Sequence, residues 1–188
     1  MATSVTLILL FIANLCFAET KNDIYQVEII AFAYTPQAPV KDHNEIYPSY
    51  PALPDYNNSQ PLNLEPQSAD FKLDQILDKS LLQLNREENL ISKKDEYQIL
   101  FHYGWLQKAG EEKKLLINTE TNGEFSLKGT IKVHKGYYYI ADINLELIKL
   151  NSPKEHIVFK IRRKLKSKEM NYIDHPKLGL LIEIFPKM

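Results

Sequence analysis

The chain of 188 residues carries 23 Lys and Arg against 24 Asp and Glu, which gives a formal net charge of −1. This balance indicates neither a nucleic-acid partner nor adhesion to an anionic membrane surface. With 44% hydrophobic residues the composition is that of a globular protein with a sizeable core. The single cysteine is Cys16, so the chain beyond it can form no disulfide.

The N-terminal segment predicts a secretory signal peptide. Residues 5–17 are almost wholly apolar, and Cys16 and Ala18 occupy the two positions at which a signal peptidase requires small residues. We expect cleavage after Ala18, which leaves residues 19–188 as the mature chain. A helix of residues 5–17 would rise about 20 Å, against about 30 Å of bilayer hydrocarbon, so we expect no membrane anchor. Lipidation of Cys16 is the alternative, but Leu15 stands where that processing requires a small residue.

Two contrasting segments follow the signal. Residues 24–32 alternate and then become nearly continuously apolar, which predicts a strand covered first on one face and then on both. Residues 35–67 hold seven of the ten prolines and show no helical or strand period. A loop of this length is usually either disordered or functional.

One amphipathic helix is predicted over residues 68–84. Ser68 or Asp70 can cap its first turn, because a short side-chain oxygen accepts from the free backbone N–H groups there. The polar run at residues 86–89 ends it. The apolar residues that recur at helical spacing are Leu73, Ile76, Leu77, Leu81 and Leu84.

Strands dominate the remainder of the chain. Alternation predicts them at 97–105, 125–133, 137–150, 156–166 and 179–185. The second and third of these form an antiparallel hairpin that turns at Lys135 and Gly136. We therefore predict a single α+β domain at residues 19–188, with a proline-rich loop at 35–67. Its core is a mostly antiparallel sheet of five to six strands with one amphipathic helix packed on it.

Three residues near the C-terminus suggest acid–base chemistry. Glu169, Asp174 and His175 place carboxylates near an imidazole, as a hydrolase would require. The alternative is a turn, because Asp174, His175 and Pro176 also suit one. No Ser, Cys or second His completes a nucleophile pair, so we expect no catalytic residue and no cofactor. The five histidines are scattered singly, and we expect no metal site.

Cationic and aromatic residues suggest binding instead. Arg162 and Arg163 are adjacent on a strand and point to opposite faces, so Arg163 falls on the apolar face and needs a carboxylate such as Glu169 or Asp174. The pair fixes the last hairpin or recognises a ligand carboxylate. Trp105 stacks on a sugar ring or packs in the core. A basic sheet face that binds an anionic ligand is a further possibility, although acidic residues of the strand between its cations would neutralise much of it. Its basic residues are Lys128, Lys132, His134, Lys160, Arg162 and Lys164.

Three stretches together resemble the CsiV family of periplasmic peptidoglycan-binding proteins. They are YQVEII at 25–30, YQILFHYGWLQ at 97–107, and RRKLKSKEMNYIDHP at 162–176 running on to Gly179, with LKGTI at 127–131 in the middle hairpin. The chain departs from the family pattern at Leu106, Lys108 and Lys168. The resemblance implies a Gram-negative periplasmic location, peptidoglycan binding and support of cell-wall assembly and cell shape. It also implies a lipoprotein partner that activates a penicillin-binding protein.

We therefore predict a non-catalytic peptidoglycan-binding protein. Two rivals stay open: a module that docks protein partners through the proline-rich loop, and a wall hydrolase built on the C-terminal carboxylates and histidine. The residues predicted to bind the ligand are Arg162, Arg163, Glu169, Tyr172, Asp174, His175 and Trp105.

Overall fold

A computed structural model describes most of the chain beyond the predicted signal. The predicted signal peptide, its cleavage site and most of the proline-rich loop lie outside the described residues. The described ranges are 24–35, 60–61, 63–67, 75–111, 114–119, 123–151 and 156–187.

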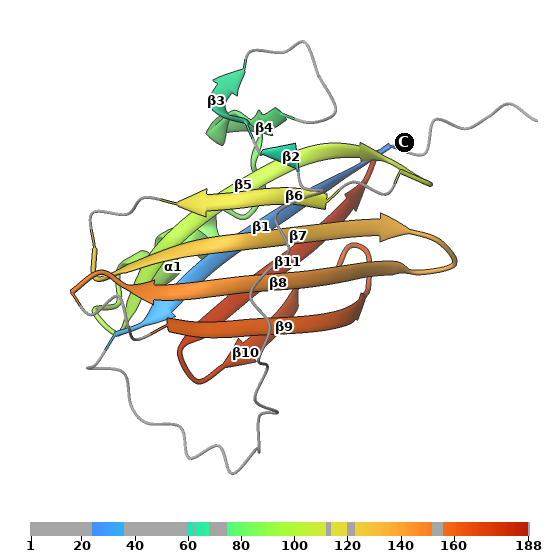
Figure 1. The fold of residues 1–188 in the computed structure, drawn as a ribbon. Coiled ribbons are helices and arrows are strands. Elements are labelled where there is room, and N and C mark those ends of the chain that lie inside the picture. The colour runs from blue at the N-terminus through green and yellow to red at the C-terminus, as the bar shows by residue number, and fades with distance from the viewer. Residues whose placement is uncertain are drawn as a thin grey trace, which may run out of the picture.

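The described strands form two main sheets that lie face to face (Figure 1). The first sheet is antiparallel, in the order β10-β11-β1-β5. Its strands are β1 (Ile24–Tyr34), β5 (Tyr97–Lys108), β10 (Asn171–His175) and β11 (Leu178–Pro186). Its two central strands, β11 and β1, come from opposite ends of the chain, so the assembly of this sheet needs pairing between distant segments.

The second sheet has the order β2-β6-β7-β8-β9. Four of its strands are antiparallel, and β2 (Gln60–Pro61) is added in parallel at one edge. The antiparallel strands are β6 (Lys114–Thr119), β7 (Phe125–Lys135), β8 (Tyr139–Lys149) and β9 (His156–Leu165). A separate parallel pair joins β3 (Asn63–Gln67) and β4 (Gln75–Leu77).

The main hydrophobic core lies between the two sheets. It joins inward residues of β1, β5 and β11 to those of β7 and β8 in one cluster. Tyr25 on β1, for example, meets Tyr139 on β8 edge to face, with ring centroids 5.0 Å apart. Strict alternation along β8 buries every second residue against the first sheet.

The predicted fold is confirmed in its mostly antiparallel strands and its single α-helix, but the single sheet of five to six strands is wrong. Alternation shows that a strand buries one face, not which sheet it joins. Two half-buried sheets bury those faces against each other. Five strands were not predicted: β2 and β3 within the proline-rich loop, β4 within the predicted helix, and β6 and β10. The turn expected at Asp174 and His175 is β10 itself, with the turn following at Pro176 and Lys177.

The helix predicted over residues 68–84 is also wrong in the part that the structure describes. Residues 75–77 form β4, a 3₁₀ turn η1 spans Lys79–Leu81, and helix α1 spans Asn85–Ser92, within the run expected to be a loop. Leu81 is exposed, whereas Leu82 and Leu84 pack on the outer face of the first sheet. The buried side chain of Glu28 on β1 accepts hydrogen bonds from the backbone just before α1. The spacing of apolar residues along the sequence cannot indicate such a long-range contact.

No helix within the described ranges is both long and apolar enough to cross a bilayer. The one α-helix in the described part of the chain, α1, has eight residues. It contacts β5 on the side of the first sheet that faces away from the sandwich core. The apolar surface that this helix covers is therefore separate from the main core between the sheets.

Gly129 on β7 is required by its close approach to β8. Its φ is 144°, and a Cβ there would lie 2.2 Å from the backbone oxygen of Asn144 and 2.7 Å from the Cα of Leu145. We expect Gly129→Ala to lower the free energy of unfolding by about 3 kcal/mol, since backbone atoms must move and the φ is strained. Urea denaturation measures this. The control is Gly136→Ala, where nothing lies within 4 Å of the added Cβ, and a comparable loss there would contradict the argument.

Candidate functional site

The two outer faces of the sandwich divide the predicted ligand-binding residues. On β10, Ile173 belongs to the main core, so its neighbours Tyr172 and Asp174 lie on the outer face of the first sheet. Arg162 lies on β9, opposite Asp142, on the outer face of the second sheet. The whole core separates these two faces, so the predicted residues do not form one site.

An aromatic platform lies on the outer face of the first sheet, made of Phe32, Tyr34, Tyr97, Tyr172 and Asp174. The Tyr172 ring is parallel to that of Phe32, with centroids 6.5 Å apart and 1° between the planes. Phe32 also meets Tyr34 and Tyr97 edge to face, at 5.8 Å and 5.3 Å. Tyr172 is 43% exposed, so the platform presents an aromatic ring to solvent.

Local backbone features place the platform rings. The pairing of β1 with β5 shifts register between Ala31 and Phe32, and such a bulge re-aims the side chains beyond it. Phe32 lies opposite Gly179 on β11, and a Cβ at Gly179 would lie 2.3 Å from the Phe32 ring. Gly179 is in turn opposite Asp174 on β10. The missing side chain at Gly179 thus lets Phe32 lie over β11, next to β10.

A shared carboxylate oxygen fixes the two tyrosine hydroxyls of the platform. Tyr34 Oη donates to Asp174 Oδ1 at 2.6 Å, and Tyr172 Oη donates to the same oxygen at 2.8 Å. The two hydroxyls also lie within hydrogen-bonding distance of each other. Burial, together with the bond to Asp174, raises the pKa of Tyr34, and burial raises the pKa of Tyr172 to about 12. Both hydroxyls are therefore protonated donors at neutral pH.

Tyr34 was not predicted as a site residue. It ends β1, two residues beyond the strand that alternation indicated, and it lies far in sequence from Tyr172 and Asp174. Only the order β10-β11-β1 brings its hydroxyl to the C-terminal hairpin. The signal in the sequence that could have indicated Tyr34 was an aromatic residue just beyond the end of the predicted strand.

Arg163 pairs with neither of the two carboxylates predicted as its partners. Arg163 is exposed near the end of β9, which is an edge strand, and it forms no ion pair within the described residues. Glu169 pairs with Lys166 at 3.3 Å, and Asp174 accepts from tyrosines. A charged residue at an exposed edge needs no compensating partner, so the structural ion pair predicted for Arg163 is not formed. Recognition of a ligand carboxylate by the arginines stays a prediction.

Arg162 is 68% exposed, and its Nε lies 3.4 Å from Asp142 Oδ1. Asp142 also faces His134, at 3.9 Å from its Nδ1. These contacts connect β7, β8 and β9 on one outer face. Arg162 therefore belongs to a charged surface separate from the aromatic platform.

His175 faces the interior of the sandwich, away from Asp174. Its ring meets Phe159 of β9 edge to face at 5.4 Å, and its Nδ1 accepts from the backbone N–H of Lys177 at 3.3 Å. Burial lowers the pKa of His175 against the opposing effect of Asp174. Because Asp174 and His175 point to opposite faces and Glu169 lies in a turn, these three residues do not converge on one point.

Trp105 is a core residue. It is 2% exposed, and its Nε1 donates to Gln107 Oε1 at 3.1 Å. Gln107 Nε2 in turn donates to the backbone oxygen of Val133, at 2.7 Å, and so links β5 to the second sheet. Its burial favours packing in the core over stacking on a sugar, so we leave Trp105 out of the proposed site.

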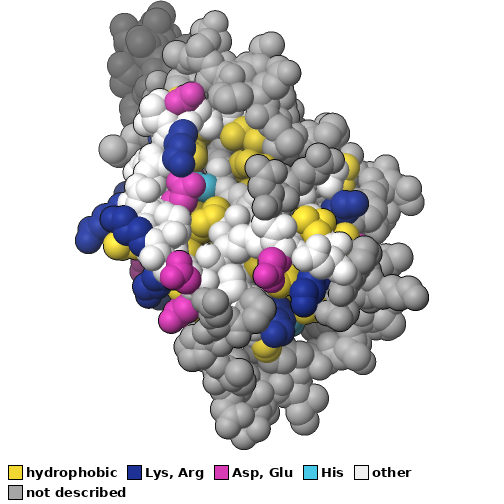
Figure 2. All heavy atoms as spheres, turned by 90° about the vertical axis from the view of Figure 1, so that its left-hand side faces the viewer, with side chains coloured by type: hydrophobic (Ala, Val, Ile, Leu, Met, Phe, Trp, Pro, Cys, Tyr) yellow, Lys and Arg dark blue, Asp and Glu magenta, His cyan; other side chains and the backbone are white. Residues whose placement is uncertain are grey.

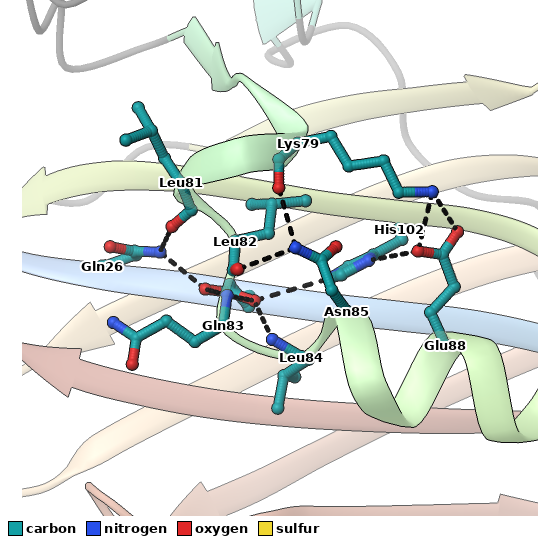
Figure 3. A network of polar contacts seen from close by, with 10 residues as sticks. Gln26, Lys79, Leu81, Leu82, Gln83, Leu84, Asn85, Glu88 and His102 are labelled. Carbon is teal, nitrogen blue, oxygen red and sulfur yellow. Dashed lines mark hydrogen bonds and ion pairs between the residues drawn. The ribbon is translucent and has the colours of Figure 1, made fainter.

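A buried polar network holds α1 on the first sheet (Figure 3). Glu28 on β1 is fully buried and accepts from the backbone N–H groups of Gln83 and Leu84, at 2.8 to 3.0 Å, and from Gln26 Nε2 at 2.6 Å. These N–H groups precede the first turn of α1, where a negative charge is favourable. Glu28 is therefore the contact that positions the start of the helix, and the sequence analysis did not single it out.

His102 extends this network to α1 itself. Its Nε2 lies 3.4 Å from Glu28 Oε2, and its Nδ1 lies 3.2 Å from Glu88 Oε2. Lys79 Nζ contacts the same Glu88 oxygen at 3.0 Å. Burial alone would raise the pKa of Glu88, but the hydrogen bonds from Lys79 and His102 outweigh burial and lower it. The network thus ties β1, β5 and α1 together.

Two hollows open on the described surface, and the first borders the platform at Tyr34. One, of about 500 Å³, opens at the end of the sandwich, and Figure 2 shows hydrophobic side chains between scattered charges on that end. The other, of about 460 Å³, lies on the outer face of the second sheet. Within the described ranges no three His, Cys, Asp or Glu side chains group as metal ligands would. The residues lining the first hollow are Tyr34, Phe125, Leu147, Lys149, His156, Ile157 and Lys177.

Comparison with known proteins identifies the family of the chain. No curated protein and no solved structure gives a significant match. A family model described as peptidoglycan-binding protein, CsiV, matches residues 1–187. This match spans all three stretches that carry the resemblance in the sequence, including β1, β5 and the C-terminal hairpin that build the platform. The chain therefore belongs to the CsiV family of peptidoglycan-binding proteins.

Proposed function

We propose that the chain is a non-catalytic periplasmic protein that binds peptidoglycan through the aromatic platform and supports cell-wall assembly. The observation that carries the proposal is the exposed Tyr172 ring, stacked on Phe32 and held by Asp174. Family membership supports the ligand class. The apolar run at residues 5–17 supports export by a signal cut after Ala18.

The chemistry of the platform suits the glycan strand of peptidoglycan. Sugar rings present flat patches of C–H groups that pack on an aromatic face, and hydroxyl and acetamido groups at their rim. Tyr172 offers the aromatic surface, and its hydroxyl and that of Tyr34 lie beside it with Asp174. Because Asp174 holds both hydroxyls, the platform loses little side-chain freedom when a sugar binds.

Family membership also supports a role beside a lipoprotein that activates a penicillin-binding protein, and we include this partner in the proposal. The proline-rich loop remains the candidate docking segment for such a partner, and its residues 36–59 lie outside the described part of the chain. Deleting residues 37–66 tests this role separately from wall binding. In the proposal the wall contact is direct, so the deleted chain still binds peptidoglycan.

A Tyr172→Ala chain is expected to bind glycan strands about tenfold more weakly, because one stacking surface is lost. The measurement is calorimetry with soluble glycan strands from which an amidase has removed the peptides and whose lactyl carboxyl groups have been converted to amides. Tyr172→Phe keeps the ring and should lose no more than about threefold. The control is Tyr137→Ala, which removes a tyrosine that is 95% exposed on the β7–β8 turn. Equal binding by the Tyr172→Ala and Tyr137→Ala chains would exclude the platform.

The hydrolase rival needs Glu169, Asp174 and His175 to act together. Their side chains point to different sides of the molecule, so the geometry favours binding over cleavage by these residues. Release of soluble muropeptides by the wild-type chain, lost on His175→Ala, would establish the hydrolase and overturn the proposal.

A further inference from the structure

The outer face of the second sheet carries an excess of positive charge. We call it the basic face and define it as the outward side chains of β6 to β9. Adjacent strands set Lys132 opposite Asp142 and Asp142 opposite Arg162, so one carboxylate lies between two cations. The Lys and Arg residues of this face are Lys114, Lys128, Lys132, Lys160, Arg162 and Lys164, against the acidic residues Asp142 and Glu146.

The local pairing leaves Lys160 on this face without an acidic partner among the described residues. Asp142 is shared by Arg162, at 3.4 Å, and His134, at 3.9 Å. Lys160 is exposed and lies across from Asn144, a neutral residue, and forms no ion pair within the described ranges. The predicted neutralisation of this face by the acidic residues of β8 is therefore incomplete. Clustered cations of this kind attract anionic groups.

A hollow of about 460 Å³ opens within the basic face. Lys160, Arg162 and Asn144 all line it. Asn144 Oδ1 is buried and has no hydrogen-bond partner among the described residues. A buried acceptor without a donor is unfavourable, so a ligand that brings an N–H group to this point gains a hydrogen bond.

We propose that this hollow binds the carboxylate end of the peptides that branch from the glycan of peptidoglycan, an inference that rests on the proposed function. A peptide end combines a carboxylate with an amide N–H a few ångströms away. The carboxylate contacts Lys160 and Arg162, and the N–H donates to Asn144 Oδ1. In the wall the lactyl carboxyl groups of the glycan are joined to the peptides as amides, so the free carboxylates lie in the peptide part and the basic face is selective for that part.

The two outer faces then bind two different parts of one polymer. The aromatic platform and the basic face are separated by the sandwich core, so one chain contacts a glycan strand on one side and a peptide on the other. Weak contacts on both sides reinforce each other when the ligand is a continuous network, because the second contact becomes intramolecular. Binding to intact sacculi is then tighter than binding to either isolated part.

The test uses the mature chain from Glu19 and soluble wall peptides released by an amidase, followed by calorimetry. We expect the wild-type chain to bind these peptides, and to bind at least about tenfold more weakly once their carboxylates are converted to amides. Equal binding of the amidated peptides would overturn the proposal. This comparison needs no variant, so it does not depend on whether any variant folds.

A matched pair of charge reversals locates the site. Lys160→Glu with Arg162→Glu is expected to weaken peptide binding by at least about tenfold. The control, Lys93→Glu with Lys187→Glu, makes the same change in net charge at exposed positions outside β6 to β9 and should change binding by less than about twofold. Equal losses in both would show that net charge alone acts, and would overturn a defined site.

Further arms separate this proposal from the proposed function. If the wild-type chain binds the peptide-free glycan strands with amidated lactyl groups but does not bind the soluble peptides, the peptide site is wrong and the platform stands. If it binds peptides but not peptide-free glycan, the platform is wrong and the peptide site stands. If Lys160→Glu with Arg162→Glu abolishes binding to phosphatidylglycerol vesicles and leaves peptide binding unchanged, the basic face serves a lipid surface and the proposal is overturned.

Discussion

A Glu28→Gln chain is expected to lose about 3 kcal/mol of its free energy of unfolding. Glu28 is fully buried, and its carboxylate accepts from two backbone N–H groups and from Gln26. A glutamine keeps one acceptor oxygen but replaces the second oxygen with an amide NH2 group. That NH2 group would face N–H donors, and two donors cannot form a hydrogen bond with each other. The negative charge at the start of α1 is lost as well.

Thermal unfolding followed by circular dichroism measures this effect, and we expect the midpoint to fall by about 10 °C. The control is Glu183→Gln, the same chemical change at the residue directly opposite Glu28 on β11. Burial, with repulsion from Glu28 and Glu87, raises the pKa of Glu183. Its ionised form is therefore disfavoured in the fold, and its neutral replacement should leave stability at pH 7 unchanged or slightly higher. Similar losses in both variants would contradict the role given to Glu28.

The raised pKa of Glu183 also makes the free energy of unfolding depend on pH in a definite direction. A carboxyl group whose pKa is raised by folding favours the folded state at low pH, and this contribution is lost as the pH rises through the folded pKa. The wild-type chain therefore loses that part of its stability as Glu183 ionises. The Glu183→Gln chain should not show this loss.

A Trp105→Ala chain is expected to lose about 4 kcal/mol, because removing a buried indole leaves a cavity between the sheets. Gln107 Oε1 would also lose the Nε1 donor that it accepts from. Urea denaturation gives the value. The more informative variant is Trp105→Phe, which keeps most of the ring volume and is expected to fold.

Trp105→Phe separates the core role of the residue from a ligand role. If Trp105 only packs, the folded Trp105→Phe chain binds sacculi as tightly as the wild type despite a lower stability. A loss of binding by the folded variant as large as that expected for Tyr172→Ala would return Trp105 to the site. The contrast between these two aromatic residues follows from their exposure, 2% against 43%.

Alternation along the sequence predicted the long strands because each has one buried face. It identified β1, β5, β7, β8, β9 and β11 with nearly their observed bounds. It failed over residues 75–92, where Leu82 and Leu84 pack as single anchors and Glu28 supplies the contact at the helix start. The spacing of apolar residues within a segment carries no information about a contact with a residue more than fifty positions away.

The candidate site shows the same limit. Tyr172 and Asp174 were predicted from residue type in the C-terminal motif, and they lie together on one face. Arg162 comes from the same motif but lies on the opposite side of the sandwich, because β9 and β10 belong to different sheets. Sequence neighbours can be separated by a core, and Tyr34 joins the platform only through the pairing of β1 with β11.

The most direct test of the account is cosedimentation of the chain from Glu19 with purified sacculi, run beside an assay for new reducing ends. The account predicts that the wild-type chain pellets, that no reducing ends form, and that more of the Tyr172→Ala chain stays in the supernatant. A folded wild-type chain that remains in the supernatant, or sacculi that release reducing ends, would contradict it.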